Sequence, residues 1–200
     1  MRTKPAKVPR AGAYLFARDR QARRSCPGSG LMLLGIRFPV DLTEVGLPAV
    51  CRFGGVSVWH GPVAWQWDGG DPQLPIELVD SPESVDVTEW GVDHVVVTTP
   101  DLDATVSALQ DGGADFRRMG LARGRRAAFL LFGPVVEVVE VEHGPTMLWG
   151  LALETDQHLD VVAGNWTSSG WKVSGPHDAV QSGRRILSVI GTNLAVMTRR

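Results

Sequence analysis

The sequence has little cysteine and no long hydrophobic run. Its 200 residues include two cysteines, Cys26 and Cys51, which form no CxxC or related pattern. Neither a disulfide framework nor a structural zinc site is therefore expected, and two reduced thiols are typical of a cytoplasmic protein. Apolar stretches such as LMLLGI at 31–36 are far shorter than the ~20 residues that a transmembrane helix needs. We predict a cytoplasmic protein with no membrane partner.

A large excess of charge is also missing, because the formal net charge is -2. Nothing in this balance favours a nucleic-acid partner or an anionic membrane surface. The sequence contains no phosphate-binding P-loop, no GxGxxG after a strand and no serine or cysteine nucleophile motif. The cofactor, if any, is left unknown by these observations.

The first thirty residues are the one strongly basic segment, with eight Lys or Arg and a single acid, Asp19. No secretory apolar core follows them. We expect residues 1–31 to be a disordered basic segment outside the fold. A transit-like leader, or a true start at Met32, are the alternatives.

The chain does contain an internal repeat. DHVVVTTPDLDATVSAL aligns without a gap onto GLALETDQHLDVVAGNW at an offset of 57 residues. The apolar positions recur at i, i+4 and i+7, which is one face of a helix; they are Leu102, Val106 and Leu109 in the first copy and Leu159, Ala163 and Trp166 in the second. Asp101 is a plausible N-cap of the first helix, and Trp166 is expected in the core. Each copy predicts a strand, a helix and three more strands.

These copies define the expected architecture. Unit one spans 91–143 and unit two spans 148–198, within a domain of residues 90–200. Residues 32–70 read as a partial extra β unit, because FGGVSVWHGPVAWQW resembles FGPVVEVVEVEHGPTMLWG, and 71–89 as an acidic linker with at most one short strand. One unit alone leaves a sheet face bare, whereas two can curl their strands into a cup that suits a small ligand. The fold class is therefore α+β, with two βαβββ units.

Paired units of this kind resemble the vicinal oxygen chelate superfamily, which includes glyoxalase I, bleomycin-resistance proteins and extradiol dioxygenases. DHVVVTTPDLDATVSAL is similar to the family's opening signature H-x-x-h-x-V-x-D-h-d, in which h is apolar, and VVEVVEV to its closing strand h-E-h-h. The resemblance covers about 91–198. It implies a glyoxalase-like fold, a small-molecule ligand, a possible homodimer, and a metal held by one residue from the first and last strand of each unit.

In unit one, the resemblance selects His94 and Glu137 as candidate catalytic or metal-binding residues. Opposite His94, unit two has Leu151, or Gly150 with a one-residue shift, and opposite Glu137 it has Ala195. None of these side chains coordinates a metal. A divalent metal is therefore possible but disfavoured, because a catalytic zinc normally has three protein ligands.

Strand alternation predicts how these residues point. Glu137 shares a face with Val135 and Val139 toward the cup, while the Val136 and Val138 face, which also carries Glu140 and Glu142, is expected toward solvent. His94 is expected on the face of Val96 and Thr98, and Asp93 on the opposite face with Val95 and Val97. Three outcomes stay open: a metal-free His94–Glu137 pair, which is favoured; a metal held by both plus water or substrate; or two unrelated residues. In such a pair Glu137 would orient His94 as a general base.

Arginine and tryptophan supply further candidates. Arg125–Arg126 and Arg184–Arg185 recur before corresponding strands, and we name Arg126 and Arg185 as candidate ligand-binding residues because a guanidinium grips an anion. A solvated strand start, or a partner for Glu137, is the alternative. Trp149 is a third candidate, as the floor of a pocket for a planar ligand, with core packing as its alternative.

Three functions stay open. The protein binds an unidentified small molecule in the cup without a complete metal site; or it is a lyase, isomerase or dioxygenase with a nonstandard site that uses His94 and Glu137; or it keeps the scaffold for dimerisation only. Fold resemblance does not choose among them, because one scaffold hosts many chemistries.

Overall fold

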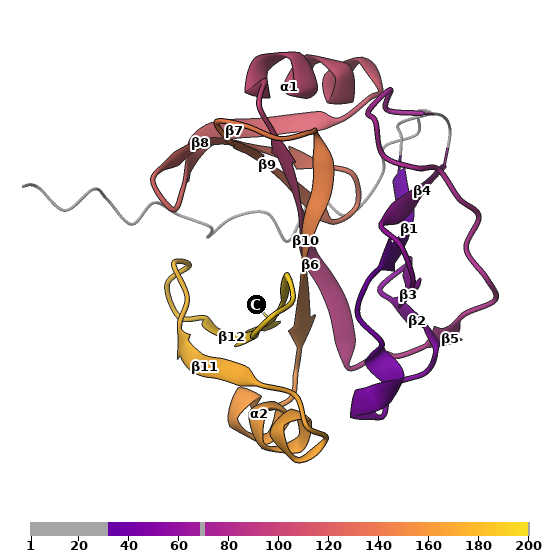
Figure 1. Ribbon diagram of the computed structural model, residues 1–200, viewed down its shortest axis with the longest axis vertical. Coiled ribbons are helices and arrows are strands. Elements are labelled where there is room, and N and C mark those ends of the chain that lie inside the picture. Colours follow the sequence, from indigo (N-terminus) through magenta and orange to yellow (C-terminus); the bar gives the residue numbers. More distant parts are fainter. Residues whose placement is uncertain (1–31, 69–70, 200) are drawn as a thin grey trace, which may run out of the picture.

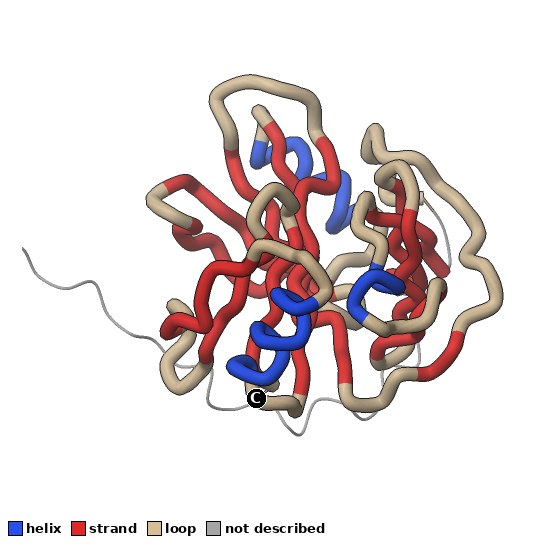
Figure 2. Tube along the Cα trace, turned by 60° about the horizontal axis from the view of Figure 1, so that its bottom comes forward, coloured by secondary structure: helices blue, strands red, loops and turns tan. Residues whose placement is uncertain are grey.

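The computed structural model describes residues 32–68 and 71–199, which form two sheets and two α-helices. The predictions for residues 1–31, Cys26 included, lie outside the described residues. Neither helix of the described part is long and apolar enough to cross a membrane. The fold is α+β, with many more residues in strands than in helices (Figure 2).

The larger sheet has eight strands in the order β11-β12-β13-β10-β6-β9-β8-β7. Unit one consists of β6 (Trp90–Thr99), α1 (Leu102–Asp111), β7 (Asp115–Ala122), β8 (Arg125–Leu131) and β9 (Val135–Glu140). Unit two consists of β10 (Met147–Thr155), α2 (Leu159–Ser168), β11 (Val173–Asp178), β12 (Arg185–Val189) and β13 (Leu194–Thr198). Within each unit the first and last strands are parallel, and the units join through antiparallel β6 and β10. The two βαβββ units predicted from the repeat are confirmed.

Both helices lie outside the curved sheet, at opposite ends of the molecule (Figure 1). The predicted helical stripe packs on the core in both helices: Leu102, Val106 and Leu109 of α1 and Leu159 and Trp166 of α2 are buried, and Ala163 of α2 is partly buried. Asp101 caps α1 by accepting a hydrogen bond from the backbone N–H of Ala104 at 3.0 Å, which satisfies a donor that the first helical turn leaves free. Both the cap and the core position of Trp166 are confirmed.

The predicted exposure of the second face of β9 is wrong. Val136 and Val138 are buried rather than solvent-facing, because α1 packs on that side of the sheet. Each buried valine stabilises the fold by about 1.5–3 kcal/mol relative to an exposed one. The acidic residues that suggested solvent lie at the end of the strand, where Glu140 pairs with Arg126.

The smaller sheet precedes the two units and has the order β4-β1-β3-β2-β5. Its elements are β1 (Met32–Phe38), the 3₁₀ helix η1 (Leu42–Val45), β2 (Val50–Phe53), β3 (Val56–His60), β4 (Ala64–Asp68) and β5 (Val85–Asp86). β1 is parallel to β3 and antiparallel to β4, as β6 is parallel to β9 and antiparallel to β10. The predicted partial unit thus repeats the pairing of a full one, with a short 3₁₀ helix in the place of α1.

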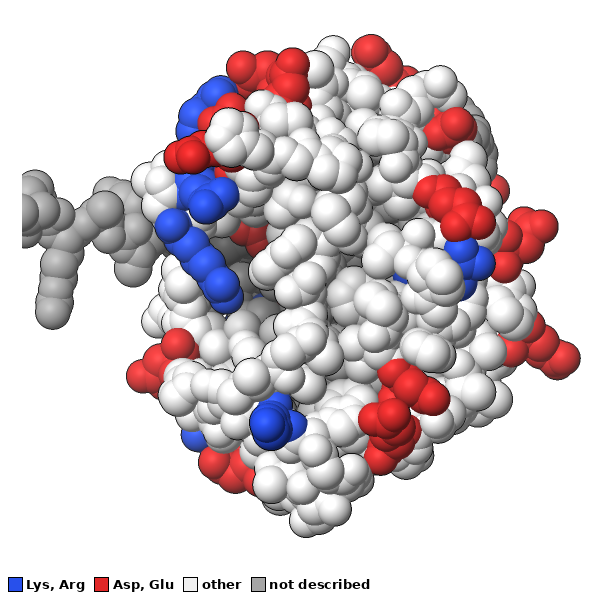
Figure 3. Space-filling view, viewed as in Figure 1, with Lys and Arg blue, Asp and Glu red and all other residues white. Residues whose placement is uncertain are grey.

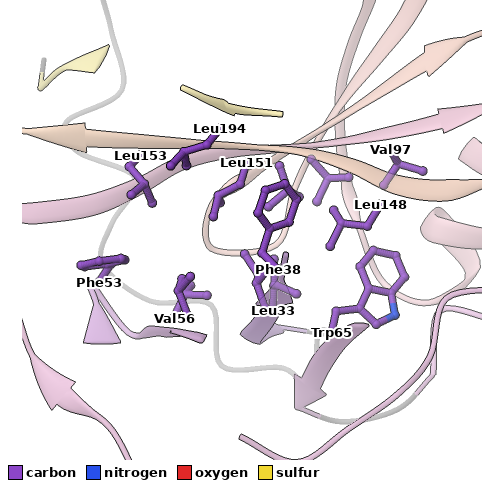
Figure 4. Packing of buried hydrophobic residues seen from close by; sticks show 14 of the residues in the cluster. Leu33, Phe38, Phe53, Val56, Trp65, Val97, Leu148, Leu151, Leu153 and Leu194 are labelled. Atoms are coloured by element: carbon purple, nitrogen blue, oxygen red, sulfur yellow. The ribbon is translucent and has the colours of Figure 1, made fainter. Parts of the chain in front are cut away.

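The two sheets pack face to face through one apolar layer. Figure 4 shows Phe38, Phe53 and Trp65 of the smaller sheet opposite leucines of β10 and β13, and all of these side chains belong to one buried cluster. The layer covers the outer face of the central strands, on the side away from the cup. Cys51 is buried within this cluster and is a free thiol whose pKa burial raises to about 11, so it is not a reactive nucleophile.

The register between the two units differs by one residue from the ungapped alignment. Thr99 and Thr155 are both buried at the ends of β6 and β10, and each accepts a hydrogen bond at 3.2 Å from the backbone N–H two residues later. These equivalent threonines are 56 residues apart, whereas the helices that follow are 57 apart. Unit two has one more residue in the turn between strand and helix, which shifts the strand equivalence.

Candidate functional site

The cup-facing part of β6 contains a β-bulge at Asp93. His94 pairs with Ala152 and Val92 with Leu153, so Asp93 is an extra residue without a partner on β10. A bulge of this kind re-aims side chains, and the carboxylate of Asp93 lies against the ring of His94. The prediction that Asp93 and His94 occupy opposite faces is therefore wrong, because regular alternation ends at the bulge.

Asp93, His94 and Glu137 form a short acid–imidazole–acid array. His94 Nδ1 lies 2.7 Å from Asp93 Oδ2, a hydrogen bond, while His94 Nε2 lies 3.6 Å from Glu137 Oε2, which is ion-pair range but beyond a hydrogen bond. The side chains of His94 and Glu137 are each 18% exposed and that of Asp93 is 7% exposed. Asp93 therefore orients the imidazole, in the role that the sequence suggested for Glu137.

The two carboxylates have opposite pKa shifts. Burial raises the pKa of Glu137, and the attraction of His94, Arg123 and Arg118 offsets this only in part. Burial also acts to raise the pKa of Asp93, but hydrogen bonds and charge from His94 and Arg184 outweigh it and hold the pKa below its usual value. Asp93 is thus a fixed anion, and Glu137 is a carboxyl group that protonates more readily than usual.

Unit two contributes a buried arginine to this array. Arg184 Nη1 donates to Asp93 Oδ1 at 2.6 Å, its Nε donates to the carbonyl of Thr198 at 2.7 Å, and its Nη2 lies 3.4 Å from Glu154 Oε2. Its side chain is 5% exposed. Glu154 in turn lies 3.5 Å from Nε of Arg199. A chain of contacts between acidic and basic side chains therefore runs from Glu137 in unit one to Arg199 at the end of unit two.

The residues that correspond to His94 and Glu137 in unit two have side chains that cannot coordinate a metal. Val96 pairs with Glu137 as Ala152 pairs with Ala195, so Gly150, not Leu151, is the counterpart of His94. Leu151 faces the core between the sheets (Figure 4) and is 2% exposed. Across residues 32–68 and 71–199, no three His, Cys, Asp or Glu side chains are grouped to hold a metal. The described residues do not fit the metal that the resemblance implies, since unit two supplies no donor to complete a shell around His94 and Glu137.

A second row of cup-facing residues crosses unit one beside this array. Arg118, Phe129, Glu137 and Val96 are paired neighbours on four adjacent strands. The guanidinium of Arg118 lies 4.2 Å from the centre of the Phe129 ring, a cation–π contact. It also lies over Gly120, where an added Cβ would come within 2.8 Å of its Nη1. Sequence reasoning missed Arg118 because only the strand pairing places it beside Glu137.

The space-filling view shows the molecule hollowed between the two units, with Lys and Arg side chains along one side of the opening (Figure 3).

Arg126 and Arg185 are not brought to the array. Arg126 pairs with Asp103 at 3.0 Å and with Glu140 at 2.9 Å, and Arg185 pairs with Asp160 at 2.6 Å. Asp103 and Asp160 lie in the first turns of α1 and α2, so each arginine ties a strand to the helix that covers it. Arg126 also lines an outer cleft of about 430 Å³.

Trp149 lies at a bulge in β10 between Leu148 and Gly150 and is 39% exposed. By the 56-residue equivalence, Trp149 is the counterpart of Asp93. Both first strands therefore contain a bulge at the same place, followed by the position of His94 in unit one and of Gly150 in unit two.

The topology of the two units, with four strands and one helix each around a common cup, decides the fold. The paired units have a vicinal oxygen chelate-like fold. Solved structures similar to the chain include methylmalonyl-CoA epimerase from Mycobacterium tuberculosis, with 16% identity over 55% of this chain and 88% of that one and a TM-score of 0.46.

Two further similar structures have comparable coverage and TM-scores. Streptomyces coelicolor methylmalonyl-CoA epimerase in complex with 2-nitronate-propionyl-CoA has 19% identity over 54% of this chain and 95% of that one, with a TM-score of 0.45. A hypothetical protein from Bacillus halodurans has 11% identity over 56% and 96%, with a TM-score of 0.47. No family model and no curated protein matches the sequence. At these scores the fold assignment rests on the topology itself.

Proposed function

We propose that the cup binds a small organic molecule and that His94 is the residue that exchanges a proton with it, without a bound metal. The observation that carries this proposal is the hydrogen bond of 2.7 Å between His94 Nδ1 and Asp93 Oδ2, which leaves Nε2 as the nitrogen directed toward Glu137. Cytoplasmic location and homodimerisation stay predictions from the sequence.

The arrangement suits acid–base chemistry. A neutral imidazole that donates through Nδ1 to a fixed anion carries its lone pair on Nε2, and the anion stabilises the imidazolium that forms when Nε2 takes a proton. Glu137, whose pKa is raised by burial, is 3.6 Å from that nitrogen and is suited to pass the proton on. This orientation supports a second candidate function, an isomerase or lyase that removes and returns a proton of its substrate.

The contrast between the two halves of the cup supports a ligand there. Gly150 and Ala195 of unit two occupy the positions where the family resemblance would place metal ligands. Ala152 is paired with both His94 and Ala195 and lies beside these positions. Because Gly150, Ala152 and Ala195 have small or no side chains, unit two fills little of the cup beside the polar groups of unit one. Ligand sites commonly combine a few convergent polar groups with a mostly apolar surround.

A thermal-shift screen of small organic molecules tests the proposal, because a ligand that binds only the folded protein raises Tm by mass action. We expect hits whose Tm shift falls at least by half in His94→Gln. His60 lies at the exposed end of β3, so His60→Gln is the matched control and keeps the full shift. Hits that His94→Gln leaves unchanged, or a chain without hits, would favour a cup kept for its scaffold.

Metal content decides between the metal-free site and a metalloenzyme. Protein purified without chelator is expected to hold far less than one equivalent of any divalent metal, with no difference between wild type and His94→Gln. One equivalent in the wild type that disappears in His94→Gln contradicts the proposal and restores the metal-dependent alternative.

A further inference from the structure

The recurring arginine pair does two different things in the two units. The second arginine of each pair, Arg126 or Arg185, ties its strand to a helix through an aspartate. The first arginines differ: Arg125 is exposed, whereas its counterpart Arg184 is buried against Asp93. Pairing of Ser188 with Ala195 and of Phe129 with Glu137 fixes this equivalence. Only one of the two arginines has been recruited to the cup.

The reason lies across the junction between the units. Arg184, the residue just before β12 of unit two, reaches the bulge of β6 in unit one, where it contacts the carboxylate of Asp93. The symmetry-related contact would join Arg125 to Trp149, which has no carboxylate to offer. The buried pair therefore exists on the side of the junction that carries His94 and not on the other.

Arg184 holds the orientation of Asp93. Its Nε and Nη1 are fixed by the carbonyl of Thr198 at 2.7 Å and by Asp93 Oδ1 at 2.6 Å. With Oδ1 taken, the remaining oxygen Oδ2 is the one that faces His94 Nδ1, at 2.7 Å. A buried ion pair adds little net stability on average, because the desolvation of both charges offsets their attraction. Because Arg184 contacts Asp93, the residue that orients His94, we expect its role to lie in positioning the imidazole rather than in stability.

We propose that Arg184 is a positioning residue for His94: by anchoring Asp93 in the cup junction, it keeps the proton of the neutral imidazole on Nδ1 and Nε2 free as the base. This inference rests on the proposed role of His94. It makes the orientation of the imidazole in unit one depend on a side chain of unit two. The charged groups around the imidazole are Asp93, Glu137 and Arg184, with Arg118, Arg123, Glu154 and Arg199 beyond them.

NMR of the ¹⁵N-labelled histidine rings tests this without any ligand. In the wild type, the neutral form of His94 is expected to be almost wholly the Nδ1–H tautomer. In Arg184→Met we expect a mixture of the two tautomers and a higher titration midpoint of His94, because a neighbouring cation is lost while Asp93 stays. Arg185→Met removes the adjacent arginine, which pairs on the outer side, and is expected to leave both readouts unchanged.

A second variant keeps the test decisive if Arg184→Met does not fold. Arg184→Lys retains the charge but offers a single point of attachment, so the tautomer mixture is expected with a titration midpoint close to that of the wild type. Folded variants of Arg184 with the wild-type tautomer and midpoint overturn the inference, as does a wild type whose His94 is protonated on Nε2. Neither result depends on whether the cup binds a molecule, so the proposed function is judged separately by the ligand screen.

Discussion

The two units have the same fold but contribute different residues to the cup between them. Their outward features repeat: a helical stripe that packs on the sheet, a buried threonine that bonds to the helix entry, and an arginine tied to an aspartate in the first helical turn. Their cup-facing residues do not repeat. Asp93, His94 and Glu137 of unit one correspond by the repeat to Trp149, Gly150 and Ala195 of unit two. The repeated features are those that stabilise a unit, and the unrepeated ones are those suited to chemistry.

The difference also means that, at these corresponding positions, the unfavourable burial of charge is confined to unit one. Glu137 and Asp93 are largely buried carboxylates in unit one, whereas unit two fills the same positions with uncharged side chains. Burial of a charge is unfavourable unless it is paired, and Arg184 of unit two supplies the pairing for Asp93. Unit two thus supports the site of unit one while holding no copy of it.

The largest expected effect tests the register between the units. Leu151→His places an imidazole in the layer between the two sheets, where Leu151 is 2% exposed, and is expected to lower the free energy of unfolding by on the order of 3–5 kcal/mol. Gly150→His instead enters the cup, where its Cβ would meet Val96 and the Asn193 carbonyl at 3.4 Å, and is expected to cost about 1–2 kcal/mol. Urea unfolding measures both, and equal losses would contradict the 56-residue equivalence.

The next prediction concerns variants that give unit two the metal-coordinating side chains it lacks. Gly150→His combined with Ala195→Glu gives unit two the donors that unit one has, and four such donors around one cup suit a divalent metal. We expect zinc binding at least 100-fold tighter than in the wild type, or about 2.7 kcal/mol, measured by calorimetric titration.

Two controls accompany the restored site. Adding His94→Gln to the double variant is expected to abolish most of the gain, because one of the four donors is removed. Leu151→His with Ala195→Glu directs its histidine into the core and leaves one donor fewer in the cup, so it is expected to show a much smaller gain. Tight zinc binding by that second combination would mean that the strands are related by 57 residues.

The sequence predicts more of the fold than of the site, and the residues show why. The helical stripes and the Asp101 cap depend on local spacing, which the sequence displays directly. The position of Gly150 depends on one additional residue in the turn at 156–158, and an ungapped alignment misses it. Asp93 and Arg184 depend on a bulge and on contact between units. Such features follow from strand pairing across the whole sheet, which no local pattern reveals.

A smaller effect separates the buried acid of unit one from the alanine of unit two. Because burial raises the pKa of Glu137 above its ordinary value of 4.5, the folded protein binds that proton more tightly than the unfolded chain. The resulting stabilisation is present below pH 4.5 and is lost as the pH rises through the folded pKa. Glu137→Gln is therefore expected to be more stable than the wild type at pH 7, by about 1 kcal/mol.

The pH dependence of this difference is the measurement that checks it. Urea unfolding of both proteins between pH 4 and pH 8 should show the advantage of Glu137→Gln shrinking as the pH falls. Glu140→Gln, on the same strand but in an ion pair with Arg126, is the control and is expected to gain nothing at pH 7. An advantage of Glu137→Gln that grows toward acid would contradict the raised pKa.

The smallest effect concerns what the two units have in common. Arg126→Met and Arg185→Met each remove one strand-to-helix tie on the exposed outer surface, where solvent and salt screen the pair. We expect each to lower Tm by about 1–2 °C in low salt, and the loss to shrink in 1 M sodium chloride. The two ties are equivalent by the repeat, and Arg126→Met also removes the pair with Glu140, so its loss should equal that of Arg185→Met or exceed it slightly. A much larger loss for one of them, or a loss that salt leaves unchanged, would mean that the repeated arginine has acquired a different role in that unit, as Arg184 has.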